Sequence, residues 1–263
     1  MQTEYSEWRD FAIEASREAA TLARTMIRAG FTTDMKANGT VVTDVDHAVE
    51  RLLRDRIGAA YPTHAILGEE FGQTGTVSPD VPLWCLDPVD GTTNLANGLP
   101  LWCVSIGVIF GDAAVAGVVN APMTDDIYAA AQGAGATWNG KPLPRLASGG
   151  QIAPEEAYIV CGTSVRRMDL GRLQAKLRIL GSAALDLCYV AAGQAKGCQC
   201  ACTSLYDLAA GLCIAGETGV RNVWLESGEP YRPMAHLLAG GSCDVTLVTA
   251  PEGTMAYLLG VLR

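Results

Sequence analysis

The sequence predicts an α/β protein built from alternating layers of helices and sheets. Apolar residues recur at helical spacing over residues 8–27 and again over 48–57. Short apolar runs bounded by glycine and polar residues begin at residue 65, and such runs are typical of strands. Both patterns return from residue 170 onward. Helices and strands that alternate in this way favour stacked layers of the two.

Two helices are expected in the N-terminal part of the chain. The first covers residues 8–27, and Gly30 is expected to end it. The second begins after Thr43, because Thr43 and Asp46 have the spacing of a capping box, in which two side chains satisfy the free N–H groups of a helix start.

The middle of the chain is expected to form strands and turns. Runs 65–67 and 83–86 end in polar residues, and 103–110 is expected to pair with 113–119 across Gly111 and Asp112. Asn139-Gly140 is a further turn signal. The later part is expected to contain helices at 170–177, 183–192, 207–217 and 251–262, and a strand at 198–202.

The chain length fits one large domain or two packed lobes. It has 263 residues, of which 49% are hydrophobic and 18% charged, and this composition provides a substantial core. The proline- and glycine-bearing stretch 144–154 is the expected boundary. We therefore expect an N-terminal lobe of residues 1–145 and a C-terminal lobe of residues 146–263.

The charge of the chain restricts its partners. The net charge is −9, which argues against binding to nucleic acid or to an anionic membrane, since both need a basic surface. A phosphorylated substrate remains compatible, because carboxylates can hold cations that in turn hold phosphate. Charged residues interrupt the first thirty positions, and no run is long and uncharged enough to cross a bilayer. We expect a cytoplasmic protein.

The nine cysteines are expected to be reduced, buried residues. Strand alternation would place Cys198, Cys200 and Cys202 on one face. A thiolate metal site or a redox site is the alternative interpretation. The usual zinc spacing is missing and no histidine is near in the sequence, so packed thiols are favoured.

The segment Asp87-Pro88-Val89-Asp90-Gly91-Thr92-Thr93-Asn94 carries the clearest chemical signal. Two carboxylates follow an apolar strand, proline stiffens the backbone between them, and glycine permits a tight turn. A helix that begins at the following Thr-Thr-Asn would present free N–H groups to a phosphate. Carboxylates beside such an anion site predict divalent cations between the two, since magnesium prefers oxygen ligands.

The simplest alternatives assign structural roles to the same residues. Aspartate is common in turns, Asp207 could cap the helix that follows it, and Asp46 could merely complete its capping box. Glu70 could belong to a solvated acidic pair with Glu69, and Lys36 could be a solvated lysine.

Four segments together resemble the inositol monophosphatase family. Residues 87–94 resemble its first signature, and Tyr206-Asp207-Leu208-Ala209-Ala210-Gly211 resembles the second, which usually begins with Trp-Asp. Gly68-Glu69-Glu70 and the pair Thr43 and Asp46 resemble its upstream acidic and Val-Thr-x-x-Asp elements. The resemblance covers residues 36–219 and implies a layered αβαβα sandwich, magnesium-dependent phosphatase activity and a homodimer.

The resemblance implies two or three Mg²⁺ ions and a set of ligands for them. Glu70, Asp87 and the carbonyl of Val89 would bind the first ion. Asp87, Asp90 and Asp207 would bind the second. Where a third ion takes part, Glu70 would be its main protein ligand.

The resemblance also assigns the remaining roles. Thr92 would act with Glu70 on the attacking water, and the backbone of Gly91 and Thr92 would hold the phosphate, with Lys36 and Asp46 as supporting residues. The alcohol side of the substrate would contact a further set: Gly181, Ser182, Ala183, Cys200 and Asp207.

One departure from the family pattern concerns this alcohol side. Cys200 stands where animal inositol monophosphatases carry a glutamate that contacts inositol hydroxyls, and a thiol is a poor substitute for a carboxylate acceptor. We expect hydrolysis of a small polyol or sugar phosphate, with inositol 1-phosphate the first candidate. Fructose 1,6-bisphosphate, histidinol phosphate and nucleotide 3′-phosphates remain open as substrates, and so does a non-catalytic scaffold that binds metal or phosphate.

Overall fold

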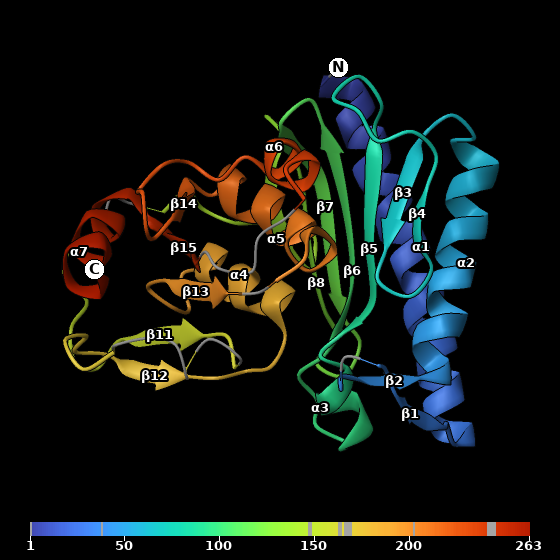
Figure 1. Cartoon of the computed structure of the whole chain (residues 1–263), viewed down its shortest axis with the longest axis horizontal. Coiled ribbons are helices and arrows are strands. Elements are labelled where there is room, and N and C mark those ends of the chain that lie inside the picture. Colours follow the sequence, from blue (N-terminus) through green and yellow to red (C-terminus); the bar gives the residue numbers. More distant parts are fainter. Residues whose placement is uncertain are drawn as a thin grey trace.

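Five layers make up the computed structural model of the chain. It describes residues 2–37, 39–146, 149–162, 165, 170–201, 203–240 and 246–263. Figure 1 shows helices α1 and α2, an eight-stranded sheet, helices α4 and α5, a five-stranded sheet and helix α7 stacked in that order. This arrangement confirms the predicted αβαβα sandwich.

Helices α1 (Gln2–Ala29) and α2 (Asp44–Ala60) form the first layer, as expected. Gly30 follows α1 with φ of 93°, a backbone conformation that glycine adopts without strain. The capping box of α2 is present, since the Thr43 N–H donates to Asp46 Oδ2 at 2.9 Å and Val45 N–H to Thr43 Oγ1 at 3.2 Å. Apolar residues of both helices, including Trp8 and Leu53, pack on one face of the large sheet.

The eight-stranded sheet has the order β10-β9-β8-β7-β6-β5-β3-β4. In this sheet β3 pairs with β5 in parallel, and the other neighbouring strands pair antiparallel. Gly111 and Asn139-Gly140 turn the chain with positive φ at the predicted places. The strands are β3 (Ala65–Gly68), β4 (Gly72–Thr74), β5 (Leu83–Asp90), β6 (Cys103–Phe110), β7 (Ala113–Ala121), β8 (Asp126–Ala131), β9 (Gly135–Trp138) and β10 (Lys141–Pro142).

Helices α4 (Ala183–Ala191) and α5 (Leu205–Glu217) lie between the two sheets. Glycines let α5 approach the large sheet closely. A Cβ at Gly107 would lie 2.5 Å from Ala209 Cβ, and one at Gly117 would lie 2.4 Å from the Ala210 carbonyl oxygen. Small residues on both surfaces therefore fix the depth of α5.

The five-stranded sheet has the order β12-β11-β13-β15-β14, and α7 (Glu252–Leu262) covers its outer face. Cys198 and Cys200 are buried free thiols that point into the α4/α5 layer, whereas Cys202 lies outside the described residues. The strands are β11 (Ala157–Val160), β12 (Lys176–Arg178), β13 (Cys198–Ala201), β14 (Val220–Trp224) and β15 (Thr246–Pro251).

The predicted helix at 170–177 is wrong. Leu170, Leu173 and Leu177 have helical spacing, but the described part of this segment is a turn followed by strand β12, which pairs in parallel with β11. Leu173 packs under α7 while Leu177 is exposed, so the leucines do not share one buried face. The open edge of β11 offers backbone hydrogen bonds that outweigh a weak local preference for helix.

Smaller elements connect these layers. Strands β1 (Thr33–Met35) and β2 (Val41–Thr43) form a hairpin before α2, and α3 (Thr92–Ala96) follows β5. Helix α6 (Pro233–Leu238) precedes β15. None of the helices within the described ranges is long and apolar enough to cross a membrane.

Candidate active site

Strand β5 delivers two buried carboxylates to one end of the large sheet. Its pairing with β6 shifts register between Asp87 and Asp90, because the three steps from Asp87 to Asp90 face the two steps from Ser105 to Cys103. This bulge lies at the predicted Asp-Pro-Val-Asp sequence and re-aims the side chains at the strand end. Asp87 is 2% exposed and Asp90 is 8% exposed.

Gly91 ends the strand where no other residue fits easily. Its φ is 99°, and a Cβ there would lie 2.9 Å from the Leu101 carbonyl oxygen. Asn94 fastens the following helix, since its side-chain amide donates to the Leu180 carbonyl at 2.8 Å as well as to the Leu101 carbonyl at 2.5 Å. The motif after β5 is thereby held against the segment that enters α4.

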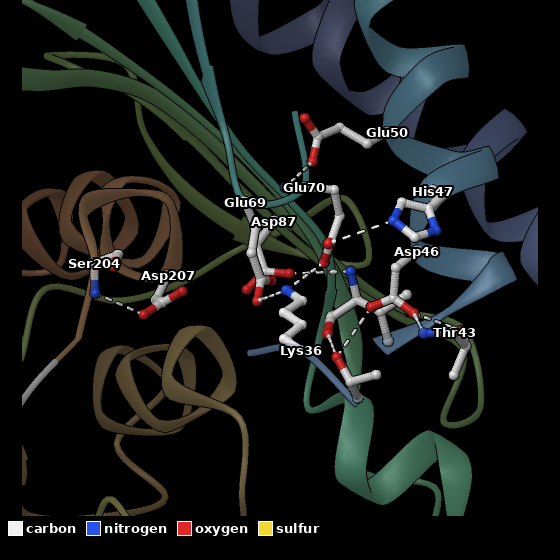
Figure 2. A network of polar contacts seen from close by, with 12 residues as sticks. Lys36, Thr43, Asp46, His47, Glu50, Glu69, Glu70, Asp87, Ser204 and Asp207 are labelled. Atoms are coloured by element: carbon white, nitrogen blue, oxygen red, sulfur yellow. Dashed lines mark hydrogen bonds and ion pairs between the residues drawn. The ribbon is translucent and has the colours of Figure 1, made fainter. Parts of the chain in front are cut away.

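The turn between β3 and β4 places two glutamates beside Asp87. Because β3 runs parallel to β5, Gly68 lies opposite Leu86, and the Glu69 N–H donates to the Leu86 carbonyl at 3.2 Å. Lys36 Nζ lies 2.8 Å from Glu69 Oε1 and 2.7 Å from Glu70 Oε1. Figure 2 shows these side chains together near the start of α2.

Asp46 and Thr92 are joined across the site. Thr92 Oγ1 lies 3.0 Å from Asp46 Oδ1 and 2.9 Å from the Val89 carbonyl oxygen. A hydroxyl has one proton to donate, so it bonds one of these acceptors at a time and keeps lone pairs for another donor. Asp46 therefore does more than complete its capping box.

Asp207 reaches the same region from α5. Its Oδ2 accepts the Ser204 N–H at 2.7 Å, which is the expected contact of an acidic residue in the first turn of a helix. Figure 2 shows Asp207 on the opposite side of the acidic group from Asp46. Asp207 both caps its helix and contributes to the charge of the site, so the two interpretations of this residue are compatible.

The carboxylates repel one another strongly. Burial raises the pKa of Asp87 well above its usual range, and the charges of Glu69, Asp90 and Asp207 raise it further. Burial and Asp90 likewise raise the pKa of Asp207, although hydrogen bonds from Ser204 and with Asp87 oppose this. Burial raises the pKa of Asp90 to about 6 against the opposing bonds from Ser182 and the Ala183 and Ala184 N–H groups.

Within the described part of the chain, Lys36 forms ion pairs with the two glutamates and with none of the three aspartates. Burial lowers the pKa of Lys36, but its bonds to Glu69 and Glu70 more than offset burial and raise it. Burial raises the pKa of Glu70, and the bond from Lys36 opposes that shift. The ammonium thus holds the two glutamates, while the shifts on Asp87, Asp90 and Asp207 come from burial and from neighbouring carboxylates, among which Glu69 acts on all three.

The donor set suits a hard divalent cation. Carboxylate and carbonyl oxygens are the ligands that Mg²⁺ prefers, and a cation would relieve the mutual repulsion of Asp87, Asp90 and Asp207. Across the described ranges, no three Asp, Glu, His or Cys side chains lie close enough together to enclose an ion as they stand. Because Glu70 is paired with Lys36, its use as a ligand requires that ion pair to open.

The residues predicted for the alcohol side divide into two groups. Ser182 Oγ donates to Asp90 Oδ2 at 2.7 Å and the Ala183 N–H to Asp90 Oδ1 at 3.2 Å, so both hold Asp90 at the start of α4. Gly181 lies beside Gly91 and Asn94, with φ of 87°. Cys200, by contrast, is 1% exposed and packs with core residues of the α4/α5 layer.

Sequence reasoning missed Glu50. This residue is fully buried in α2, and its Oε2 accepts the Glu70 N–H at 2.7 Å. Its spacing of four from Arg54 was a visible signal, because such pairs are neighbours on a helix, but a surface pair gives the same pattern.

The five layers and the buried acidic cluster define an α/β protein with a candidate site for cations and phosphate. A family model described as the inositol monophosphatase family matches residues 4–250. The chain belongs to the inositol monophosphatase family.

Relatives and solved structures agree with this membership. "Inositol-1-monophosphatase SuhB" of Mycobacterium tuberculosis is 39% identical over 236 residues, covering 84% of this chain and 78% of the relative. "Nus factor SuhB" of Pasteurella multocida is 32% identical over 243 residues, covering 88% and 90%. The structure of an inositol monophosphatase from Thermotoga maritima matches with a TM-score of 0.80 at 27% identity, covering 96% of this chain and 95% of that one.

Proposed function

We propose that this protein is a Mg²⁺-dependent phosphomonoesterase that hydrolyses inositol 1-phosphate or a closely related polyol phosphate. The observation that carries the proposal is the cluster of Asp87, Asp90 and Asp207, whose pKa values are raised by burial and by neighbouring carboxylates. Burying such charges is costly unless a cation compensates them. Relatives named as inositol-1-monophosphatases support the substrate class.

Each residue of the site has a role in this proposal. Asp87, Asp90, Asp207, Glu70 and the Val89 carbonyl would hold two or three ions. When bound, Mg²⁺ supplies the positive charge that screens the phosphate from the carboxylates and makes nearby water more acidic.

The remaining groups position the reactants. Thr92 Oγ1, by donating to Asp46 Oδ1, keeps a lone pair with which to accept a hydrogen bond from the attacking water, and the Glu70 carboxylate would accept the proton that this water loses. The backbone of Gly91 and Thr92 would hold phosphate oxygens, and Lys36, displaced from Glu70 by the cation, would remain paired with Glu69. Fixed geometry and neutralised charge account for most of the rate of phosphoryl transfer.

The test is phosphate release from inositol 1-phosphate by wild type and by Asp87→Asn. The asparagine oxygen still accepts the Val89 N–H that Asp87 Oδ1 accepts at 3.0 Å, so the local fold is kept while a charged ligand is lost. We expect wild-type release to require Mg²⁺ and to fall by at least about a hundredfold in the variant. Exposed Asp80→Asn is the control and should be unchanged. Activity of Asp87→Asn near that of wild type would contradict the proposal.

A panel of monoesters distinguishes the possible alcohols. Cys200 is buried and offers no carboxylate to substrate hydroxyls, so we expect weaker discrimination among polyol phosphates than a glutamate would give. Fructose 1,6-bisphosphate, histidinol phosphate and a nucleotide 3′-phosphate are the other substrates to assay. Release from none of them, with Mg²⁺ bound, would favour a non-catalytic scaffold.

The assembly and location of the protein are also part of the proposal. We propose a homodimer, supported by exposed apolar side chains at Leu99 and Ile179. Light scattering after size-exclusion chromatography tests it, and a monomer mass would contradict it.

We propose a cytoplasmic location, for which the free thiols of Cys198 and Cys200 are the support.

A further inference from the structure

Helix α2 holds a buried carboxylate directly beneath the turn that carries Glu70. Glu50 is fully buried, its Oε2 accepts the Glu70 N–H at 2.7 Å, and its Oε1 accepts the Phe71 N–H at 3.2 Å. Figure 2 shows Glu50 reaching from α2 to this turn. We propose that Glu50 is a positioning residue that fixes the backbone of Glu70 and so sets where the Glu70 carboxylate can bind a cation. This inference rests on the proposed function.

Gly68 supplies the space that this contact needs. A Cβ at position 68 would lie 2.1 Å from Glu50 Oε1, well inside van der Waals contact. The glycine therefore serves close packing against a carboxylate. Glu50 and Gly68 form a matched pair, since the carboxylate fits only because residue 68 has no side chain.

Arg54 extends the contact to strand β4 of the hairpin. Its Nε lies 2.7 Å from Glu50 Oε1, its Nη1 donates to Thr74 Oγ1 at 3.2 Å, and its Nη2 donates to the Gly72 carbonyl. Its guanidinium carbon also lies 5.9 Å from the ring centre of Phe71. One ion pair on α2 thus holds the turn at Glu70 and strand β4 together, and the turn cannot shift without breaking several bonds.

The Glu70 side chain is held by more exposed contacts than the Glu70 backbone. Its described polar partners are the partly exposed Lys36, at 2.7 Å, and His47, at 3.8 Å. A cation bound by Glu70 would displace the Lys36 contact but would leave the Glu50 contact intact. The backbone anchor is therefore the part of this arrangement that persists when the side chain changes partner.

Glutamine cannot replace Glu50 in this position. Both oxygens of Glu50 accept N–H bonds, and a side-chain amide would direct its NH₂ group at either the Glu70 N–H or the Arg54 guanidinium. Two facing donors repel, so Glu50→Gln should release the turn although its size is unchanged.

The experiment compares Glu50→Gln with Glu18→Gln, an exposed glutamate of α1 that pairs with Arg56. Two quantities are measured, hydrogen exchange of a peptide covering residues 66–74 and the Mg²⁺ concentration for half-maximal phosphate release. We expect Glu50→Gln to speed exchange in that peptide and to raise the half-maximal Mg²⁺ concentration about tenfold or more, with a smaller loss of rate at saturating Mg²⁺. Glu18→Gln should change neither.

The inference would be overturned if Glu50→Gln changed neither the hydrogen exchange nor the half-maximal Mg²⁺ concentration. It would also be overturned if the variant released phosphate more slowly than wild type by the same factor at low and at saturating Mg²⁺. If Glu50→Gln does not fold, Gly68→Ala is used instead, because its Cβ displaces the same carboxylate and should produce the same two effects. If wild type releases no phosphate, the proposed function fails, whereas exchange at residues 66–74 still decides whether Glu50 holds the turn.

Discussion

Asp186 is a buried acid outside the proposed ligand set. It lies one turn into α4, is 1% exposed, and neither carboxylate oxygen has a hydrogen-bond partner among the described residues. Burial raises its pKa well above the usual range, and the nearby Cys161 and Asp90 raise it further. An acid in this setting holds its proton more tightly in the folded chain than in the unfolded chain.

Asp186→Asn should therefore stabilise the protein more at pH 8 than at pH 5. The raised pKa means that the folded state binds more protons than the unfolded state, so this residue lowers stability as pH rises above the unfolded value of about 4. We expect the variant to gain about 1–3 kcal/mol relative to wild type between the two pH values, measured by urea unfolding. An equal difference at both pH values would show that Asp186 has a partner that stabilises its charge.

The acidic cluster of Asp87, Asp90 and Asp207 also lowers folding stability as pH rises, and bound Mg²⁺ should oppose this loss. Asp90, with a pKa of about 6, and its neighbours Asp87 and Asp207 gain charge as pH rises, and in the folded state these charges lie together. The contribution of Asp90 to stability is therefore lost as pH rises from about 4 through 6, and Asp87 and Asp207 act in the same direction. We expect Mg²⁺ to raise the Tm more at pH 7.5 than at pH 5, by differential scanning fluorimetry. An increase that is larger at pH 5 would contradict the assignment of these groups.

Among the secondary-structure elements, α5 positions Asp207 because it lies unusually close to the sheet. Gly107 and Gly117 lie under Ala209 and Ala210, and on the other side a Cβ at Gly211 would be 2.7 Å from Leu187 Cβ of α4. The helix is therefore held at a fixed depth from two directions. Its first turn, which carries Asp207, is set by this packing as much as by its own cap.

Gly117→Ala should move α5 outward and destabilise the fold. The added Cβ would meet the Ala210 carbonyl at 2.4 Å, and such overpacking costs about 1–3 kcal/mol. Gly58→Ala in α2 is the matched control, since nothing lies within 4 Å of its Cβ, and helix propensity predicts a gain of about 0.5–1 kcal/mol. Thermal unfolding of both variants measures the contrast. A Gly117→Ala protein as stable as wild type would show that a Cβ at position 117 fits against α5 without cost, and would contradict this account of the packing.

Local patterns predicted the elements whose ends are marked by particular residues. Thr43 and Asp46 fixed the start of α2, and Gly111 marked the β6–β7 turn, because capping and turn chemistry depend on a few neighbours. Residues 170–177 were misassigned because the leucine spacing is helical, whereas the pairing that decides strand β12 is with β11, which lies elsewhere in the sequence. Strand edges are filled by contacts that a short window of sequence does not contain.

At the scale of the whole molecule, the candidate site depends on contacts between distant segments. The Thr92–Asp46 bond, the Lys36 bridge to Glu69 and Glu70, and the approach of Asp207 each join different elements. Periodicity could not predict these contacts. The family resemblance named the residues of the site, but not the Thr92–Asp46 bond or the Lys36 bridge. The contact of Glu50 with the Glu70 N–H was predicted by neither, since it needs the depth of α2 against the β3–β4 turn.

The central claim is that acidic side chains from separate layers of the fold bind the same cations. Titration calorimetry of Mg²⁺ into wild type, Asp207→Asn and the control Asp80→Asn tests it most directly. The asparagine oxygen still accepts the Ser204 N–H, so the start of α5 is preserved while one charge is removed. We predict that Mg²⁺ binds wild type and the control alike and binds Asp207→Asn at least about tenfold more weakly. Equal affinity in all three proteins would contradict the account.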